Sequence, residues 1–223
     1  HFLFNSLNAG AQLAMMEDAE QTGIFVEKMA DFFRYNVKKG QEDATLGEEL
    51  ESVDNYIYIL NVRFAGDIHF SKEADESLEH VRVPSMILQP IVENAVNHGI
   101  RDIEWEGRIH LTVTGDADYI RISVKDNGKG MTQEQIESVL SGNKEYGKEE
   151  SDSTGIGMNN VISRLELYYE EKGLVEISSE GEGKGSESDG GTACFKQGFG
   201  QGLSCNAEGC DTVLYGNRKM LLQ

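Results

Sequence analysis

The chain has 223 residues, which allows one main domain with a smaller partner. Its 20 lysine and arginine residues stand against 39 aspartate and glutamate residues, a formal net charge of −19. This charge argues against nonspecific attraction to nucleic acid or to an anionic membrane surface, so we expect no nucleic-acid partner and a local site for any anionic ligand.

No apolar run approaches the roughly 18 residues that a membrane helix needs. We therefore expect this piece to be cytoplasmic. Because it begins with His1 inside a helical pattern, we also expect it to be cut from a longer protein. The chain has three cysteines, Cys194, Cys205 and Cys210. Their spacings match neither a paired zinc site nor a disulfide framework.

Residues 1–66 have the pattern of a helical hairpin. Apolar residues recur at helical spacing from the first residues to Phe33, and again, three and four apart, over residues 46–64. His1 and Asn5 fall on a separate, polar face of the first helix. Two long helices joined by a polar turn would leave much of their apolar faces uncovered, so we expect a second copy of the hairpin to cover them in a homodimer.

Residues 67–185 change period and predict an α+β domain with alternating, half-buried strands. Polar residues dominate the stretch 141–154, which we expect to be a mobile loop. Residues 186–223 are Gly-rich at first and show no sustained period, so we expect mostly loop or disorder, with at most a short strand at "TVLY". The expected strands are 68–70, 109–113, 120–124 and 174–179. The expected helices are one that follows Pro84 and carries apolar residues from 87 to 95, one over 132–140, and one over 158–169.

The helix that reads "QPIVENAVNHG" carries an unusual number of polar residues. Gln89, Glu93 and Asn97 stand at i, i+4 and i+8 on one face, with Asn94 and His98 beside them. Buried polar groups need partners, and amide and carboxylate oxygens suit a magnesium ion that also holds phosphate. Taken alone, the pattern fits a solvated helix face equally well.

Two glycine-containing stretches follow. In "VKDNGKGM", Asp126 ends a strand, and Gly128 and Gly130 allow a tight turn where backbone can approach a ligand closely. A plain hairpin turn is the other reading. "GIGMNNV", which contains Gly155, Gly157 and Met158, opens a helix. Backbone N–H groups and the dipole at a helix N-terminus suit a polyphosphate, although a lone GxG is weak evidence.

The order and spacing of these stretches resemble the GHKL (Bergerat) ATPase fold, in which they are the N box, the G1 box, the ATP lid and the G2 box. The resemblance implies an α/β sandwich with a mixed, mostly antiparallel sheet and helices on one face. It implies that Asn94 is the magnesium ligand, that Asp126 binds adenine, and that Glu93 activates or orients at the γ-phosphate. The remaining nucleotide-binding residues would be Asn97, His98, Gly128, Gly130, Gly155, Gly157 and Met158, with 141–154 as the lid.

The first half of the chain adds a more specific resemblance. "HFLFNSLN", "FFRYN", "LGEELESVDNYIYILNVRF" and "VPSMILQPIVENAVNHGI" together are similar to the LytS/YehU-type sensor histidine kinases, and the similarity runs from His1 to about Lys184. It implies a kinase that uses ATP and magnesium and phosphorylates His1. The phosphoryl group would then pass to the receiver domain of a response regulator. The resemblance also implies a parent protein anchored in the membrane, and Asn5 would position water for dephosphorylation.

Two departures from this pattern leave other functions open. Phe2 follows His1, so no neighbouring base is evident, and the tail after residue 185 lacks the expected final strand, which would leave an exposed sheet edge. The alternatives are a scaffold that binds ATP without transferring phosphate and a GHKL ATPase that drives a clamp.

Overall fold

The computed structural model of the chain describes residues 7, 10–12, 14–38, 43–64, 68–100, 103, 105–115, 119–141, 154–179, 192–193 and 210–217. Its helices are α2 (Glu20–Lys38), α3 (Leu46–Arg63), α4 (Leu88–Asn94), α5 (Gln133–Ser141) and α6 (Thr154–Tyr169). Two short helical segments are η1 (Glu76–Leu78) and the π-helical η2 (Ala95–Ile100), which continues α4. The strands are β1 (Asp43–Thr45), β2 (Ile68–Ala74), β3 (Arg82–Pro84), β4 (Gly107–Gly115), β5 (Tyr119–Asp126), β6 (Val175–Glu176), β7 (Thr192–Ala193) and β8 (Cys210–Asn217).

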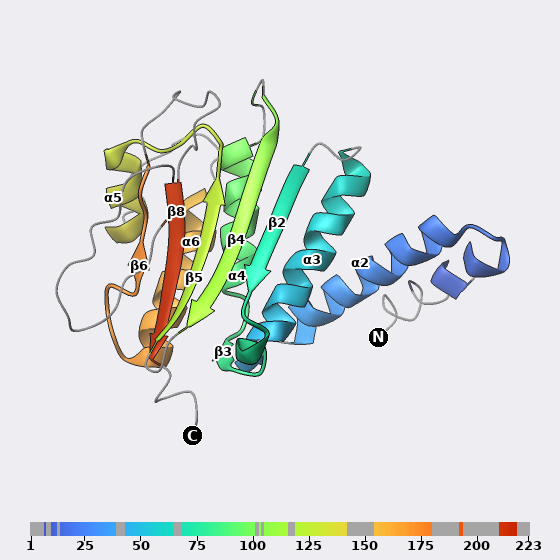
Figure 1. Ribbon diagram of the computed structural model, residues 1–223, viewed down its shortest axis with the longest axis horizontal. Helices are drawn as coiled ribbons and strands as arrows, with labels where there is room; N and C mark the ends of the chain where they lie inside the picture. The colour runs from blue at the N-terminus through green and yellow to red at the C-terminus, as the bar shows by residue number, and fades with distance from the viewer. Residues whose placement is uncertain are drawn as a thin grey trace.

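The larger sheet is mixed and mostly antiparallel. Its strand order is β2-β4-β5-β8-β6, with β7 paired to β5. Only β2 and β4 run parallel, and the other pairs are antiparallel. Figure 1 shows α3, α4 and α6 together on one face of this sheet, while α2 reaches away from it. The predicted fold class, α+β with helices on one face of a mixed sheet, is therefore confirmed.

The core lies between the sheet and the helices. Alternate residues of β4 and β5 point into it, because side chains of a strand alternate between the two faces of a sheet. Leu111, in the middle of β4, is fully buried. The same apolar cluster contains residues from α3, α4 and α6, so α3 shares its core with the sheet. These buried residues include Leu50 and Val53 of α3, Leu88 and Val92 of α4, and Met158 and Leu165 of α6.

The first helical region differs from the expected single long helix. Residues 14–16 are helical, but the helix ends at Asp18, whose φ is 57°, and α2 begins only at Glu20. The N–H of Ala19 donates to the carbonyl of Ala14, and that of Asp18 donates to Met15. This pair of bonds is the Schellman arrangement that closes a helix end. The sequence hides this stop because aspartate takes the left-handed position that glycine usually occupies.

Residue Thr45 sets the start of α3. Its hydroxyl accepts from the N–H of Glu48 at 3.2 Å, and the Glu48 carboxylate accepts from the N–H of Thr45 at 2.8 Å. This capping box satisfies backbone donors that a helix cannot pair internally. It fixes the residue at which α3 begins after β1. It therefore also fixes the position along the α3 axis of the side chains that contact α4.

The described part of the tail consists of β7 and β8, and the other residues of 186–223 lie outside the described part of the chain. Strand β8 pairs with β5 on one side and with β6 on the other, so it lies inside the sheet. The expected exposed edge is therefore covered in this structure, and the short strand expected at "TVLY" is part of β8. A free edge of β5 presents unpaired backbone groups, and β8 satisfies them.

Replacing Leu111 by alanine should destabilise the fold strongly, because it leaves a cavity in the middle of the core. We expect the free energy of unfolding to fall by about 2–5 kcal/mol in urea denaturation. Leu167→Ala is the matched control, since Leu167 on α6 is 82% exposed and its truncation should change stability by less than about 0.5 kcal/mol. Equal losses in the two variants would contradict the placement of the core.

Candidate functional site

Helix α4 carries the predicted polar face and changes its winding where that face ends. Gln89 is 7% exposed, and its Nε2 donates to Oε1 of Glu93 at 2.7 Å. The i, i+4 pairing expected for these two residues is thus present. From Ala95 the helix widens to the π form, a rare geometry that is frequent at functional sites. The wider turn leaves Asn97 exposed.

Two of the predicted site residues end α4 side by side. Glu93 and Asn94 are both half-buried and are the last residues before the π segment. The backbone of His98 lies within η2. Segment η2 contacts β4 and β5, and α4 contacts α6. The polar end of α4 therefore lies next to the elements that carry the other two predicted clusters.

Asp126 ends β5 as the sequence predicted. Its Oδ1 accepts the N–H of Gly128 at 2.9 Å, which turns the chain back on itself. Gly128 is buried, and Gly130 has a φ of 73°, a conformation that glycine adopts without strain. Burial raises the pKa of Asp126 from 3.8 to about 7, and the bond from Gly128 opposes this rise. The charge of Asp126 is therefore poorly compensated by the protein itself.

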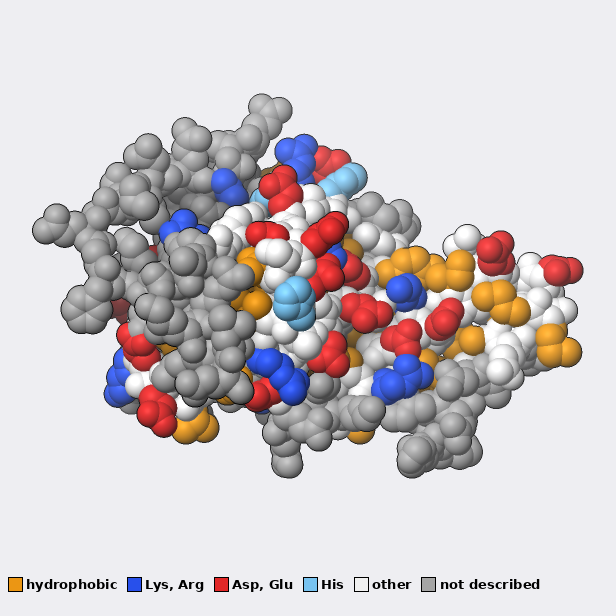
Figure 2. Space-filling model, turned by 60° about the horizontal axis from the view of Figure 1, so that its bottom comes forward, with side chains coloured by type: hydrophobic (Ala, Val, Ile, Leu, Met, Phe, Trp, Pro, Cys, Tyr) orange, Lys and Arg blue, Asp and Glu red, His pale blue; other side chains and the backbone are white. Residues whose placement is uncertain are grey.

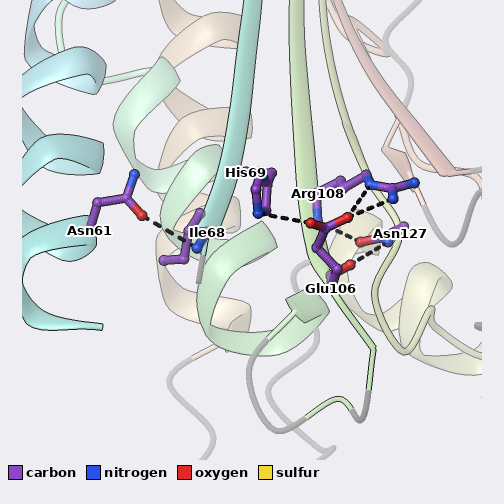
Figure 3. A network of polar contacts seen from close by, with 6 residues as sticks. All are labelled: Asn61, Ile68, His69, Glu106, Arg108 and Asn127. Atoms are coloured by element: carbon purple, nitrogen blue, oxygen red, sulfur yellow. Dashed lines mark hydrogen bonds and ion pairs between the residues drawn. The ribbon is translucent and has the colours of Figure 1, made fainter. Parts of the chain in front are cut away.

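Asn127 holds this turn against the start of β4. Its Oδ1 accepts the N–H of Arg108 at 2.7 Å, and its Nδ2 donates to the carbonyl of Glu106 at 2.8 Å (Figure 3). The indole of Trp105 donates to the carbonyl of Asn127 at 2.8 Å. The residue after Asp126 is thus fixed through both backbone and side chain. From the sequence alone Asn127 is only part of a turn, because its hydrogen-bond partners lie about twenty residues earlier in the chain.

The surface around Asn127 continues the same polar network. His69 on β2 forms an ion pair with Glu106, Nε2 to Oε1 at 2.9 Å, and Arg108 binds the other oxygen of Glu106 at 2.6 Å (Figure 3). These contacts lower the pKa of Glu106, through the hydrogen bond from Arg108 first and the charge of His69 second. Because all three side chains are exposed, the network orients the strand starts more than it stabilises them.

The glycines of the third cluster lie in the first turn of α6. A Cβ built on Gly157 would come within 3.9 Å of Pro90 Cβ, so the start of α6 runs beside α4. Gly155 is also helical. Met158, expected at the nucleotide, is only 2% exposed and belongs to the apolar core. The structure therefore brings the end of α4, the end of β5 and the start of α6 to neighbouring positions.

Some predicted residues lie outside the described part of the chain. These are His1 and Asn5, the side chain of His98, and residues 142–153 of the predicted lid. Their predicted roles stay predictions.

Glu49 of α3 was missed by the sequence analysis, although it is the most buried charged residue of the described chain. Its side chain is 1% exposed, and its carboxylate accepts the N–H groups of Met86, Ile87 and Leu88 at 2.5, 2.9 and 2.8 Å. The hydroxyl of Tyr35 on α2 also donates to it. Burial raises the pKa of the Glu49 carboxyl, while these four donors lower it. Since all four partners donate, they fit the ionised form.

Two protein families match the chain. Residues 1–68 match a family described as histidine kinase. Residues 82–204 match the histidine kinase-, DNA gyrase B- and HSP90-like ATPase family. The first match contains His1, and the second contains the polar end of α4, Asp126 and the glycines of α6.

Several relatives share about 30% of their residues with the chain. Sensor histidine kinase BtsS of Escherichia coli K12 is 30% identical over 180 residues, 81% of this chain and 29% of the relative. Sensor histidine kinase YpdA of the same strain is 33% identical over 177 residues, 77% and 29% of the two chains. Sensor protein LytS of Staphylococcus haemolyticus is 28% identical over 182 residues, 80% and 30%. The chain spans about three tenths of the length of these curated relatives.

A search of solved structures gives more distant similarities. The catalytic domain of histidine kinase ThkA is 17% identical, with a TM-score of 0.47, and the match covers 79% of this chain and 98% of that chain.

The raised pKa of Asp126 predicts a specific dependence of stability on pH. Folding shifts this pKa from 3.8 to about 7, so the folded state binds a proton more tightly than the unfolded state. The resulting stabilisation is complete below pH 4 and is lost as the pH rises to 7, with a slope of at most about 1.4 kcal/mol per pH unit. In Asp126→Asn this component should be absent.

The test is urea unfolding of wild type and Asp126→Asn at several values between pH 4 and pH 8. The difference in free energy of unfolding between the two proteins should decrease steadily up to about pH 7. Glu171→Gln neutralises an exposed side chain and serves as the control, with the same pH profile as wild type. A difference that does not vary between pH 4 and pH 7 would show that Asp126 titrates normally.

Proposed function

The chain belongs to the LytS-type family of sensor histidine kinases, and from this membership we propose that it is the ATP-dependent protein-histidine kinase core of a two-component system. One observation supports the proposal most directly. The polar end of α4, the carboxylate at the end of β5 and the glycine-containing start of α6 lie on neighbouring elements. These are the groups needed to bind a base, a metal and a polyphosphate in one site.

Asp126 would bind the adenine of ATP. An ionised carboxylate accepts a hydrogen bond from the exocyclic amine of adenine and offers nothing to the carbonyl at the same position of guanine. Burial makes such a bond strong, and a donor from the ligand would stabilise the carboxylate charge that the protein leaves poorly compensated. The bonds made by Asn127 keep the carboxylate in place before the nucleotide arrives.

The phosphates would lie between the start of α6 and the end of α4. Gly155 and Gly157 leave backbone N–H groups and the helix dipole accessible to an anion. Asn94 would hold a magnesium ion, and its amide oxygen next to the Glu93 carboxylate suits that ion. The described residues contain no group of three His, Cys, Asp or Glu side chains that could hold a metal by themselves. Phosphate oxygens would therefore complete its coordination, and the ion would neutralise charge on the phosphates.

In the transfer step, an imidazole nitrogen of His1 would attack the γ-phosphorus of ATP. A P–N bond forms, the bond from the γ-phosphorus to the bridging oxygen breaks, and ADP leaves. A neutral imidazole is nucleophilic near neutral pH, so the site has mainly to align the reactants and to neutralise charge. Glu93 would orient the reacting groups. The phosphoryl group would then pass to an aspartate on the receiver domain of a response regulator.

The arm that projects from the sheet, residues 14–38 with α2, would form the homodimer. Met15, Met16 and Val37, which lie between residue 14 and the end of α2, are large hydrophobic residues exposed there, and Figure 2 shows hydrophobic side chains along this arm. A second copy would bury them.

No helix among the described residues is long and apolar enough to cross a membrane. We propose that this piece works on the cytoplasmic side of a longer parent that is anchored in the membrane.

Incubation with γ-labelled ATP and magnesium tests the proposed reaction. The wild-type chain should acquire acid-labile label, as expected of a phosphohistidine, and His1→Gln should acquire none. Asp126→Asn should lose label because the adenine is no longer held. His80→Gln is the matched control, because His80 is an exposed histidine in the turn between η1 and β3. Label that survives in His1→Gln would exclude His1, and bound nucleotide without any label would favour a scaffold.

A second experiment tests the proposed role of Asn5. It follows His1 by four residues in the sequence, a spacing that would place the two on one helix face, and it would position water for attack on the phosphorylated aspartate of the partner regulator. Asn5→Ala should slow dephosphorylation of that regulator while leaving labelling of His1 intact. An unchanged rate of dephosphorylation would remove this role.

A further inference from the structure

Glu49 joins three helices that belong to different parts of the proposed mechanism. It projects from α3 and accepts the N–H groups of Leu88, the first residue of α4, and of the two residues before it, and it accepts a hydrogen bond from Tyr35 on α2. Helix α2 belongs to the hairpin that would carry His1, whereas α4 carries Glu93 and Asn94. A single buried carboxylate thus connects the phosphoacceptor part of the chain with the nucleotide site.

The backbone before α4 is shaped to meet this carboxylate. Met86 has a φ of 58°, a left-handed conformation that is strained for a residue with a side chain. The carbonyl of the preceding Ser85 accepts a hydrogen bond from Arg164 on α6. Residues 85–88 are therefore held from α3 on one side and from α6 on the other, and a strained residue at their centre directs its N–H toward Glu49.

The position of this junction is transmitted to the site residues because α4 is short. From Leu88 to Asn94 the helix rises only about 9 Å at 1.5 Å per residue. A helix of this length moves as a rigid unit, so a shift at its first residue moves Asn94 by a similar amount. The start of α6 would follow only in part, because Met158 in its first turns is also held in the apolar core.

A second set of contacts also connects α2 and α3 with α4. Ser52 of α3 donates to Oε1 of Gln89 at 3.4 Å, and Gln89 donates to Glu93 at 2.7 Å. Phe32 of α2 stacks on Tyr56 of α3 with ring centroids 5.8 Å apart. Burial first, and the negative charge of Glu93 second, raise the pKa of Tyr56, so this ring also lies close to the site.

We propose that Glu49 is a positioning residue through which the placement of α2 determines the register of α4, and with it the alignment of Glu93 and Asn94 at the γ-phosphate. This proposal rests on the proposed kinase function. It assigns Tyr35 as the contact that α2 uses. The simpler alternative is that Glu49 only caps α4, in which case Tyr35 contributes to stability and not to the reaction.

The variants Tyr35→Phe, Glu49→Gln and the double variant separate these roles. Tyr35→Phe removes one hydroxyl and leaves the three backbone bonds of Glu49 in place. Tyr58→Phe is the matched control, because it removes a hydroxyl from a half-buried tyrosine of α3. For each protein we would measure the free energy of unfolding, the Kd values of ATP and ADP, and the first-order rate of autophosphorylation at saturating ATP.

Loss of alignment should appear in the rate and in the γ-phosphate contacts. In Tyr35→Phe we expect the autophosphorylation rate of the folded protein to fall at least about fivefold, since small displacements of reacting groups cost much rate. The ratio of ADP Kd to ATP Kd should fall at least about threefold, while the Kd of ADP changes less than about twofold, because Asp126 and α6 hold ADP. The double variant should be no slower than Glu49→Gln alone, since both changes interrupt one connection.

Other outcomes are equally informative. If Tyr35→Phe lowers only stability and reacts at the wild-type rate, Glu49 is a cap and the positioning role is wrong. If wild type acquires no acid-labile label, the proposed kinase function fails, and the positioning role is then judged on the ratio of ADP to ATP affinity. If Tyr35→Phe leaves the ratio of ADP Kd to ATP Kd unchanged, the positioning role of Glu49 is wrong. Rate losses that multiply in the double variant would contradict a shared connection.

Discussion

Burial of the N-terminus of α4 is the constraint on which the arrangement of the helices depends. The first N–H groups of a helix have no partner within it, yet Ile87 and Leu88 are at most 1% exposed and cannot turn to water. Ile87, at the N-cap position, has no side-chain oxygen to offer. Each buried donor left unpaired would cost about 1–3 kcal/mol. A carboxylate from α3 fills this need, so α3 must stand where Glu49 reaches the start of α4.

Among the described residues, Glu49 and Asp126 both have a pKa that burial raises, but they differ in their hydrogen-bond partners. Glu49 receives four donors, which lower its pKa and offset part of the cost of removing a charge from water. Asp126 is held by a backbone N–H within its own turn, which opposes only part of the rise in its pKa. The first group is therefore suited to hold the protein together. The second is suited to a donor that arrives from outside.

Local patterns in the sequence were sufficient to predict β2, β4, β5 and β6, most helices and the order of the three clusters, but not β1, β3 or β7. The alternation in β4 and β5 follows from one strand alone, and the pairing of Gln89 with Glu93 follows from one helix. The backbone partners of Glu49 lie 37 to 39 residues further along the chain and Tyr35 lies 14 residues earlier, and no periodicity indicates them. The role of Asn127 was missed for a similar reason, because its partners also lie far away in the sequence. The helix end at Asp18 is local, but aspartate stands there in place of the glycine that usually marks such a stop.

The place of β8 has a consequence for how the protein folds. Strands β5 and β6 do not touch along their length, because β8, from far beyond both in the sequence, lies between them. Closing this part of the sheet requires contacts between distant segments, for example Ser123 with Val213, which are 90 residues apart. Such distant pairings lose chain entropy before the contacts that they form can stabilise the fold, so they slow folding. We expect the helices to form early and the sheet to remain open on one side until β8 arrives, which is the period when the chain is most exposed to aggregation.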